Sequence, residues 1–481
     1  MKESFKDRIT EYFNSKELPS HDFIFELLNS AVSVIENEIT YYRKASSTGT
    51  VGGLLDFLQN PLPTIIVPDL HARTYFLKNI FDYKLPNGFL PDDFEGTTVL
   101  DGIKAGKLRI ICIGDAMHSE LRGRQRWLDA LNEFKNNVVN GPQMTSEMLE
   151  NLWILAMILD AKITFPEHFH FLKGNHENIM NDRGGGDYPF CKFANEGEMV
   201  YSFVKKVYGD DILMLTSCFE KALPLVAALD NCVISHAEPV VHFTVDDVIN
   251  GLNNEEVVTG LTWTPNDAAQ EGSVVSMLKE FTKKEDLSNI KYFAGHRPVT
   301  GNYYLRQNGY FVQIHNPEKQ NIVLIGMPSS GKSTIGHILK EKLNKTFVDT
   351  DILIEDHIKM PISNFLNKDR EDAFRDIEEE VIGEVAKKNN LIISTGGGVI
   401  KRKNNIIRLK ANGIVIFIDR PLSLLQATNN RPLSSNRRDL EKLYYDRYDL
   451  YEEACDIKIT NDTDLEKVVE KILKEVESFY A

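Results

Sequence analysis

The stretch Gly326-Met327-Pro328-Ser329-Ser330-Gly331-Lys332-Ser333 decides the fold of the second part of this 481-residue chain. An apolar run, Ile322–Ile325, precedes it, and a helical pattern follows it. The stretch fits the pattern GxxxxGK[ST] in its required context, a buried strand before and a helix after. This context disfavours the alternative of a flexible glycine and serine turn. The sequence therefore predicts a phosphate-binding loop that opens a series of parallel strands and helices.

This loop predicts contacts with ATP and Mg²⁺. Its backbone N–H groups and the N-terminus of the following helix can surround the nucleotide phosphates. Lys332 is expected to reach the β- and γ-phosphate oxygens, and the Ser333 hydroxyl is expected to bind Mg²⁺. The other residues expected to bind ATP are Gly326, Ser329, Ser330, Gly331 and Thr334.

Further polar residues follow apolar strands in the same part of the chain. Asp349 and Asp351 come directly after a predicted strand over 346–348, so their carboxylates leave the strand end on the same side. One can hold Mg²⁺ through water while the other accepts a hydrogen bond from the hydroxyl to be phosphorylated. Three glycines over 396–398 end the strand 391–393 and permit close approach of a ligand. Two arginines have the planar fork that suits a substrate carboxylate, Arg375 and Arg447.

Taken in order, these motifs resemble the shikimate kinase family over residues 320–481. After the phosphate loop come FVDTD (347–351), FRDIE (374–378), TGGG (395–398), RPL (431–433) and RYDLYEEA (447–454). The resemblance implies transfer of the ATP γ-phosphate to the 3-hydroxyl of shikimate. Gluconate kinase and other small kinases share the phosphate loop, but they are not expected to show FRxxE and GGG together.

The resemblance also implies roles for single residues. Asp349 would hold Mg²⁺ through water, and Arg431 would close over the phosphates as part of a lid. Ser329 departs from the family, which usually has glycine at that position of the loop. The residues implied to contact shikimate are Asp351, Arg375, Gly397, Gly398 and Arg447.

The first part of the chain has a different pattern, in which five predicted strands end in metal-binding residue types. A lone histidine after a strand is more often a structural residue than a ligand. Here carboxylate and amide oxygens combine with imidazoles, which suits two divalent ions such as Mn²⁺, Fe²⁺ or Zn²⁺ bridged by one carboxylate. Two such ions can activate a water molecule and hold a phosphate. The candidate ligands are Asp69, His71, Asp115, Asn175, His236 and His296.

The order DLH, GD, GNHE, SH, GH resembles the calcineurin-like metallophosphoesterases, and residues 163–177 resemble their serine/threonine protein phosphatase branch. The resemblance implies that His176 protonates the leaving oxygen. It also implies two metal sites that share one aspartate. Asp69, His71 and Asp115 would bind the first metal, and Asp115, Asn175, His236 and His296 the second.

The first part also departs from that family. Where the family has GDxVDRG, this chain has His118 in place of the aspartate that orients the catalytic histidine and Ser119 in place of the arginine that binds phosphate. Pro68 stands where glycine is usual. The sequence leaves four arginines open as replacements: Arg122, Arg124, Arg183 and Arg297.

We therefore expect an α/β fusion. An N-terminal helical extension (1–60) is followed by a four-layer metallophosphoesterase domain with a central β-sandwich flanked by helices (61–318), and then by a phosphate-loop kinase domain with a parallel sheet (319–481). Hydrolysis of shikimate 3-phosphate by the first domain would only consume ATP, so its substrate should be another phosphate ester or a phosphoprotein. The alternative is a metal-binding first domain that regulates an active kinase or mediates an interaction.

Composition limits the location and the partners of the protein. The net charge of −15 lies mostly in residues 1–318 and repels nucleic-acid phosphates, so no nucleic-acid partner is expected. No apolar run approaches the roughly 20 residues of a membrane helix, and the charged start does not resemble a secretory signal. Five scattered cysteines are typical of reduced thiols. These features favour a soluble cytoplasmic protein.

Overall fold

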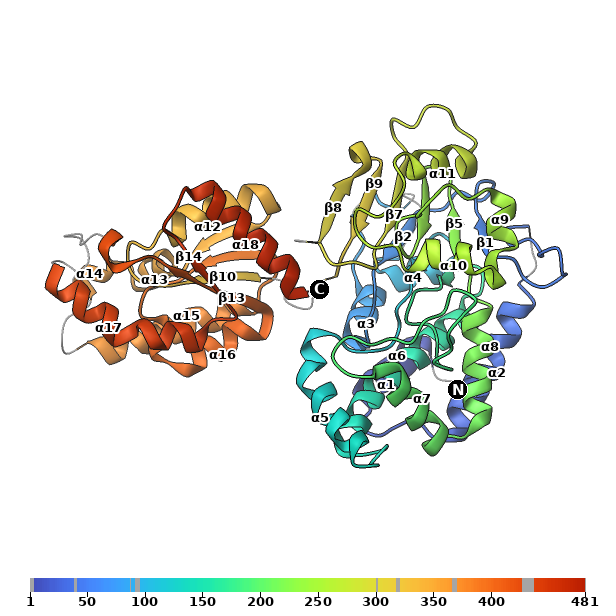
Figure 1. The fold of residues 1–481 in the computed structure, drawn as a ribbon, viewed down its shortest axis with the longest axis horizontal. Coiled ribbons are helices and arrows are strands. Elements are labelled where there is room, and N and C mark those ends of the chain that lie inside the picture. Colours follow the sequence, from blue (N-terminus) through green and yellow to red (C-terminus); the bar gives the residue numbers. More distant parts are fainter. Residues whose placement is uncertain are drawn as a thin grey trace. The chain divides into compact units, whose positions relative to one another are not determined.

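The chain divides into two compact units, Met1–Asn316 and Pro317–Ala481. The sequence predicts the division two residues later, after residue 318. The structure is a computed structural model, and it describes residues 4–38, 41–86, 88–90, 96–299, 302–316, 321–365, 370–425 and 437–480 (Figure 1).

The N-terminal unit contains two β-sheets. One is parallel and has the order β2-β3-β4, and the other is mixed and has the order β1-β5-β6-β7-β9-β8. The strands are β1 (Leu54–Asp56), β2 (Thr64–Val67), β3 (Arg109–Cys112), β4 (Phe169–Phe171), β5 (Val226–Ala228), β6 (Cys232–Ser235), β7 (Lys291–Ala294), β8 (Tyr303–Arg306) and β9 (Phe311–Ile314).

Helices cover the outer faces of these sheets (Figure 1). The helices packed in the core of the parallel sheet are α1 (Phe5–Asn14), α2 (His21–Glu36), α3 (Thr74–Asp82), α4 (Val99–Lys104), α5 (Arg124–Lys135), α6 (Pro142–Thr164), α7 (Glu196–Val207) and α8 (Asp210–Lys221). Those packed in the core of the mixed sheet are α9 (Val245–Ile249), α10 (Glu255–Thr262) and α11 (Ser273–Thr282).

Alternation of side chains along the strands builds the layers. Ile111 of β3, Ala227 of β5 and Ile234 of β6 belong to one apolar core between the two sheets. The residues next to them in sequence point away from this core, because successive side chains of a strand face opposite sides of the sheet. Ile110 joins the core under α1–α8, and Val226 joins the core under α9–α11. The expected four layers around a central β-sandwich are therefore confirmed.

The N-terminal helices end earlier than the sequence predicts. α1 and α2 pack into the same core as α6 and α8, through residues such as Ile9, Ile24 and Leu28. The predicted helical extension runs to residue 60, but β1 lies inside it and pairs in parallel with β5. The helical part therefore ends at α2. A strand of three residues is too short to show a period of two, so the sequence does not reveal it.

The C-terminal unit is a five-stranded parallel sheet with the order β11-β12-β10-β13-β14. All residues of the central β10 are buried, as expected for a strand covered by helices on both faces. The strands are β10 (Asn321–Ile325), β11 (Thr346–Asp349), β12 (Leu391–Ser394), β13 (Gly413–Asp419) and β14 (Ile457–Thr460). The helices are α12 (Lys332–Leu343), α13 (Thr350–Ile358), α14 (Ile362–Phe365), α15 (Glu371–Ala386), α16 (Lys403–Asn412), α17 (Arg437–Ala454) and α18 (Leu465–Tyr480).

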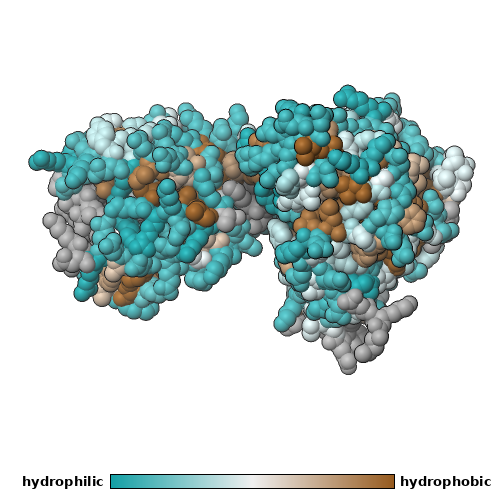
Figure 2. All heavy atoms as spheres, turned by 90° about the horizontal axis from the view of Figure 1, so that it is seen from below, coloured by the Kyte–Doolittle hydropathy of each residue, from teal (hydrophilic) through white to brown (hydrophobic). Residues whose placement is uncertain are grey.

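The surface view in Figure 2 is mostly hydrophilic, with small apolar patches. Among the described residues, no helix has both the length and the apolar character that crossing a membrane requires.

Candidate active sites

The phosphate loop connects β10 to α12 and turns through three residues with positive φ. Gly326 has φ +145°, Gly331 has φ +95° and Ser329 has φ +64°. Gly331 is the N-cap of α12. The left-handed conformation costs a residue with a side chain about 1 kcal/mol, so Ser329 adopts the conformation expected of the family's glycine at a modest cost.

Two side chains of the loop take up positions suited to phosphate and Mg²⁺. The Lys332 Nζ donates to the carbonyls of Gly326 (3.0 Å) and Met327 (2.9 Å), so its ammonium group lies inside the curl of the loop. The Ser333 Oγ donates to Asp349 Oδ2 (2.9 Å) at the end of β11. A hydroxyl and a carboxylate are the oxygen ligands that Mg²⁺ prefers, and Ser333 and Asp349 fit the ion.

The three glycines after β12 are approached closely from different sides. A Cβ on Gly396 would lie 2.4 Å from Asp351 Oδ1, and one on Gly398 would lie 2.3 Å from Arg375 Nη1. A Cβ on Gly397 would lie 3.0 Å from Pro328 of the phosphate loop. Larger residues here would displace the carboxylate or the guanidinium, which explains the glycines.

Both predicted arginine clamps are buried. Arg375 Nη1 donates to Glu378 Oε2 (2.8 Å), and Arg447 Nη1 donates to the carbonyl of Gly397 (2.7 Å). Burial raises the pKa of Glu378, although the Arg375 guanidinium opposes that shift. Glu378 therefore fixes the direction of Arg375. This role was not predicted from the sequence, although Glu378 is the last residue of the FRDIE motif.

One cavity of about 310 Å³ brings the two halves of this site together. Thr334 lies outside it, exposed in the first turn of α12, and Arg431 lies outside the described residues. The predicted residues that line the cavity are Lys332, Ser333, Asp349, Asp351, Arg375, Gly397, Gly398 and Arg447.

In the N-terminal unit, the predicted metal ligands come from the carboxyl ends of five strands. They follow β2, β3, β4, β6 and β7. Three of them have positive φ, at His71 (+45°), Asp115 (+55°) and His296 (+66°). Such conformations are uncommon and costly for residues with a side chain, and they cluster at functional sites. Here they turn the side chains sharply at the strand ends.

One group of candidate ligands surrounds His236. Its Nε2 lies 2.9 Å from Asn175 Oδ1, 3.3 Å from His296 Nδ1 and 3.6 Å from Asp115 Oδ1. Its Nδ1 lies 3.6 Å from Asp69 Oδ1. Asp69, Asp115 and His236 also bring one ligand atom each within 4.8 Å of the others.

The hydrogen-bond pattern of this group fits a cation. His236 Nδ1 lies 3.0 Å from the carbonyl of Ile113, which can only accept, so that nitrogen carries the hydrogen. In a neutral ring Nε2 then presents a lone pair, which faces the Asn175 oxygen. Ligand atoms about 2.1 Å from one ion stand about 3.0 Å apart at right angles, close to the spacing found here. Asp115, Asn175, His236 and His296 therefore fit a divalent ion.

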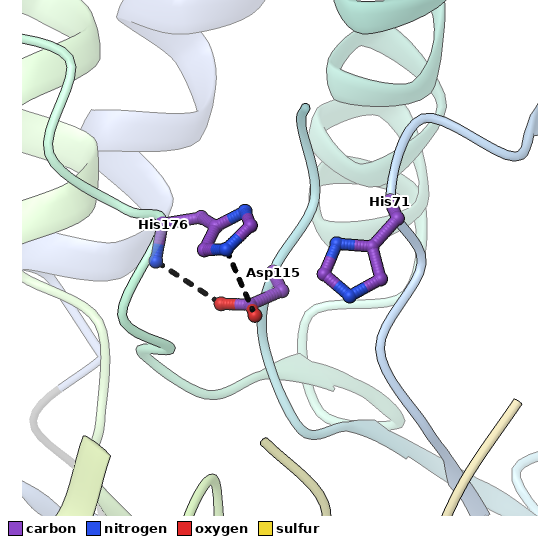
Figure 3. A group of neighbouring side chains, drawn as sticks. All are labelled: His71, Asp115 and His176. Carbon is purple, nitrogen blue, oxygen red and sulfur yellow. Dashed lines mark hydrogen bonds and ion pairs between the residues drawn. The ribbon is translucent and has the colours of Figure 1, made fainter. Parts of the chain in front are cut away.

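A second group contains His71, Asp115 and His176, whose ligand atoms also lie within 4.8 Å of one another (Figure 3). His176 Nε2 lies 3.6 Å from Asp115 Oδ2, and the His176 backbone N–H donates to Asp115 Oδ1 (3.1 Å). Asp115 belongs to both groups, as a bridging carboxylate requires. The structure groups His71 with His176, whereas Asp69 is grouped with His236.

Burial shapes the electrostatics of both groups. It raises the pKa of Asp69 to about 7 and raises that of Asp115 well above its usual value. It lowers the pKa of His71 to about 3, so this ring is neutral at physiological pH. Buried carboxylates and neutral imidazoles are stabilised by a nearby cation, which again fits a metal centre.

His118 does not replace the family's aspartate. Its ring is buried, and neither ring nitrogen has a hydrogen-bond partner within the described part of the chain. The ring packs on His176 and Phe190, with centroid distances of 5.2 and 5.0 Å. His176 Nδ1 instead lies 3.3 Å from the carbonyl of Met117, its acceptor. A backbone carbonyl therefore orients the proposed acid.

Ser119 does not replace the arginine either. Its Oγ donates to Glu147 Oε2 (2.6 Å), which also accepts from Arg126 Nε (2.7 Å). Among the four arginines left open by the sequence, Arg122 Nη2 donates to the carbonyl of His71 (3.2 Å). Arg124 lies over the ring of Phe193, and the remaining two, Arg183 and Arg297, are exposed.

Glu177 is a positioning residue that the sequence analysis missed. Its carboxylate accepts from the backbone N–H groups of Asp115 (3.0 Å), Ala116 (2.8 Å) and Gly174 (2.7 Å). It thereby joins the loops that follow β3 and β4. Its place in the GNHE motif was the sequence feature that could have indicated this role.

Comparisons with known proteins match the C-terminal unit. Residues 328–477 match the family model for shikimate kinase. A shikimate kinase from Clostridium botulinum is 43% identical over 160 residues, which cover 32% of this chain and 96% of that protein. A shikimate kinase 1 from Escherichia fergusonii is 39% identical over 160 residues, which cover 32% and 92%.

Solved structures resemble each unit. A shikimate kinase from Acinetobacter baumannii in complex with shikimate has 33% identity and a TM-score of 0.32, covering 33% of this chain and 94% of that one. A protein serine/threonine phosphatase from Saccharomyces cerevisiae has 15% identity and a TM-score of 0.41, covering 65% of this chain and 83% of that one. The match to the phosphatase is too distant to support a conclusion about the activity of this chain.

The parallel sheet, the phosphate loop and the cavity beside it define the C-terminal unit as a phosphate-loop kinase. The match to the family model and the identity to known shikimate kinases specify which kind of kinase this unit is. Through this unit the chain belongs to the shikimate kinase family, whose activity requires ATP and Mg²⁺.

Proposed function

We propose that this chain is a bifunctional enzyme, with a shikimate kinase in its C-terminal unit and a metal-dependent phosphoesterase in its N-terminal unit. The observation that supports the kinase assignment is the single cavity lined by the phosphate-loop residues and by the buried arginines Arg375 and Arg447. Product analysis of purified protein with ATP and shikimate tests it. Preferential phosphorylation of gluconate or a nucleoside would contradict the substrate assignment.

In the kinase reaction, the 3-hydroxyl oxygen of shikimate forms a bond to the γ-phosphorus while the bond to the ADP oxygen breaks. Asp351 accepts the hydrogen bond or the proton of that hydroxyl. Lys332 stabilises the phosphate charge, and Ser333 and Asp349 would hold Mg²⁺. Arg375 and Arg447 bind the shikimate carboxylate next to Gly397 and Gly398. We assign Arg431 to the lid, outside the described residues.

For the N-terminal unit, the proposed reaction is hydrolysis of a phosphate ester. The supporting observation is that His236 Nε2 lies 2.9 Å from Asn175 Oδ1 and 3.6 Å from Asp115 Oδ1, distances that suit ligands of one divalent ion. Two ions such as Mn²⁺, Fe²⁺ or Zn²⁺ would supply activation of water and neutralisation of phosphate charge. The residues that would hold them are Asp69, His71, Asp115, Asn175, His236 and His296.

The chain's own residues complete this proposal. In its doubly protonated form His176 gives its Nε2 proton to the leaving oxygen, while Nδ1 keeps its hydrogen bond to the carbonyl of Met117, which sets the orientation of the ring. We place the substrate among phosphate esters other than shikimate 3-phosphate, including phosphoproteins. Hydrolysis of shikimate 3-phosphate would undo the kinase reaction and only consume ATP. Five cysteines without disulfide bonds are compatible with the proposed cytoplasmic location.

A second candidate role for the N-terminal unit is regulation of the kinase or interaction with a partner by a metal-binding domain. His118 and Ser119 favour it, because they stand at the positions of two residues that the family uses for catalysis and phosphate binding and do not take over their roles. Metal analysis of purified protein and hydrolysis of p-nitrophenyl phosphate distinguish the two roles. Bound metal without hydrolysis of this substrate, of phosphometabolites or of phosphopeptides would favour regulation.

A further inference from the structure

Tyr451 is a buried residue of the kinase unit to which the proposed mechanism gives no role. It lies in α17, four residues after Arg447, so both side chains project from the same face of the helix. Its ring stacks on Phe417 of β13, with centroids 5.1 Å apart and an interplanar angle of 19°. The ring is thereby held in place, and its hydroxyl is directed at the substrate cavity's wall.

The hydroxyl of Tyr451 donates to the carbonyl of Gly397 (2.6 Å). The same carbonyl accepts from Arg447 Nη1 (2.7 Å). Burial raises the pKa of Tyr451 to about 12, against the opposing effect of the Arg447 guanidinium, so the hydroxyl keeps its hydrogen at neutral pH. One carbonyl thus joins the arginine, the tyrosine and the glycine turn.

We infer that Tyr451 is a positioning residue of the shikimate site, which holds the Gly397 carbonyl where it directs Arg447 toward the substrate carboxylate. This inference rests on the proposed role of Arg447. The glycine turn has little room to move, since a Cβ on Gly397 would already lie 3.0 Å from Pro328. A second donor on the carbonyl fixes its direction, and the carbonyl in turn selects one position of the guanidinium.

Tyr451→Phe in the full chain tests the inference, because it removes only the hydroxyl and keeps the stacked ring. The Gly397 carbonyl still accepts from Arg447, so no buried acceptor is left without a donor. The KM for shikimate should rise about three- to tenfold, the usual effect of one hydrogen bond, with kcat within about twofold and the KM for ATP unchanged.

Tyr448→Phe is the matched control. It removes a hydroxyl from the same helix, one that donates to Asp419 Oδ2 (3.1 Å) and has no contact with Gly397 among those described. Its KM for shikimate should stay near that of the wild type. An equal rise for both variants, or a rise in the KM for ATP of the same size as for shikimate, would overturn the inference.

A double-mutant cycle separates failure of the inference from failure of the proposed function. If Tyr451 acts through Arg447, Tyr451→Phe should raise the KM for shikimate less than about twofold in an Arg447→Lys background. A full effect in that background contradicts the positioning role. An unchanged KM for shikimate in Arg447→Lys alone would instead contradict the proposed role of Arg447.

Discussion

His236 Nε2 lies 2.9 Å from Asn175 Oδ1. The Ile113 carbonyl lies 3.0 Å from His236 Nδ1 and can only accept, so Nδ1 carries the ring hydrogen. In the neutral ring, two acceptor atoms therefore face each other in a buried site. Without a cation, or a proton on Nε2, this contact is unfavourable, because each lone pair loses its hydration without gaining a donor. This relationship supports the metal centre more directly than the number of histidines in the sequence.

Asp115→Asn should abolish phosphate ester hydrolysis and leave the kinase activity intact. A carboxamide has no negative charge with which to bridge two cations. The measurements are metal content by elemental analysis and rates with p-nitrophenyl phosphate and with shikimate. Asp286→Asn, at an exposed position, is the control and should retain both activities. Hydrolysis that survives in the Asp115 variant would contradict the two-metal assignment.

His176→Asn should keep the bound metal but lower turnover selectively. A poor leaving group such as an alkoxide needs the proton, whereas p-nitrophenolate leaves without it, so the loss should be larger for alkyl phosphates. Comparing the two substrate types measures this difference. Equal losses would remove His176 as the proton donor.

Glu177→Gln should loosen the metal site without touching a ligand. The amide oxygen can replace only part of the three backbone contacts, so we expect a loss of about 1–3 kcal/mol in the free energy of unfolding. Metal affinity should fall about 10- to 100-fold, as for other residues that orient ligands. Thermal unfolding and metal titration check both effects. Wild-type metal affinity in this variant would show that Glu177 does not position Asp115.

Asp351→Asn and Lys332→Ala should impair the kinase in different ways. The first removes the acceptor carboxylate, so ATP should still bind while shikimate turnover falls about 10²-fold or more. The second removes the phosphate contact and should weaken catalysis for any acceptor. ATP titration alongside steady-state kinetics distinguishes them. Loss of ATP binding in the Asp351 variant would argue against its assigned role.

Residues 1–318 and 319–481 should each fold when expressed alone. In the part of the chain that the structure describes, each unit has its own apolar cores, built from residues of that unit only. Circular dichroism and cooperative thermal unfolding of the two fragments provide the measurement. Insoluble or non-cooperative fragments would place the boundary elsewhere.

The sequence by itself predicted the motifs of both candidate sites, because short motifs at strand ends depend on local order. A run of glycine, lysine and serine after a buried strand predicts the phosphate loop wherever it occurs. The same holds for the Asp115 and Asn175 motifs, since carboxyl ends of neighbouring strands meet at one edge of a sheet. Hydrophobic patterning also indicated the parallel kinase sheet, whereas the four layers were implied by the family resemblance.

Only the tertiary structure decided contacts between residues that are distant in sequence. β1 is recognised as a strand because it pairs with β5, some 170 residues away. Glu177 reaches the backbone of Asp115, and Tyr451 reaches Gly397, through contacts that no local pattern encodes. The same is true of His118, whose ring packs on Phe190 instead of accepting a hydrogen bond from His176. Residue type limits what a side chain can donate or accept, but packing determines which partner lies within reach.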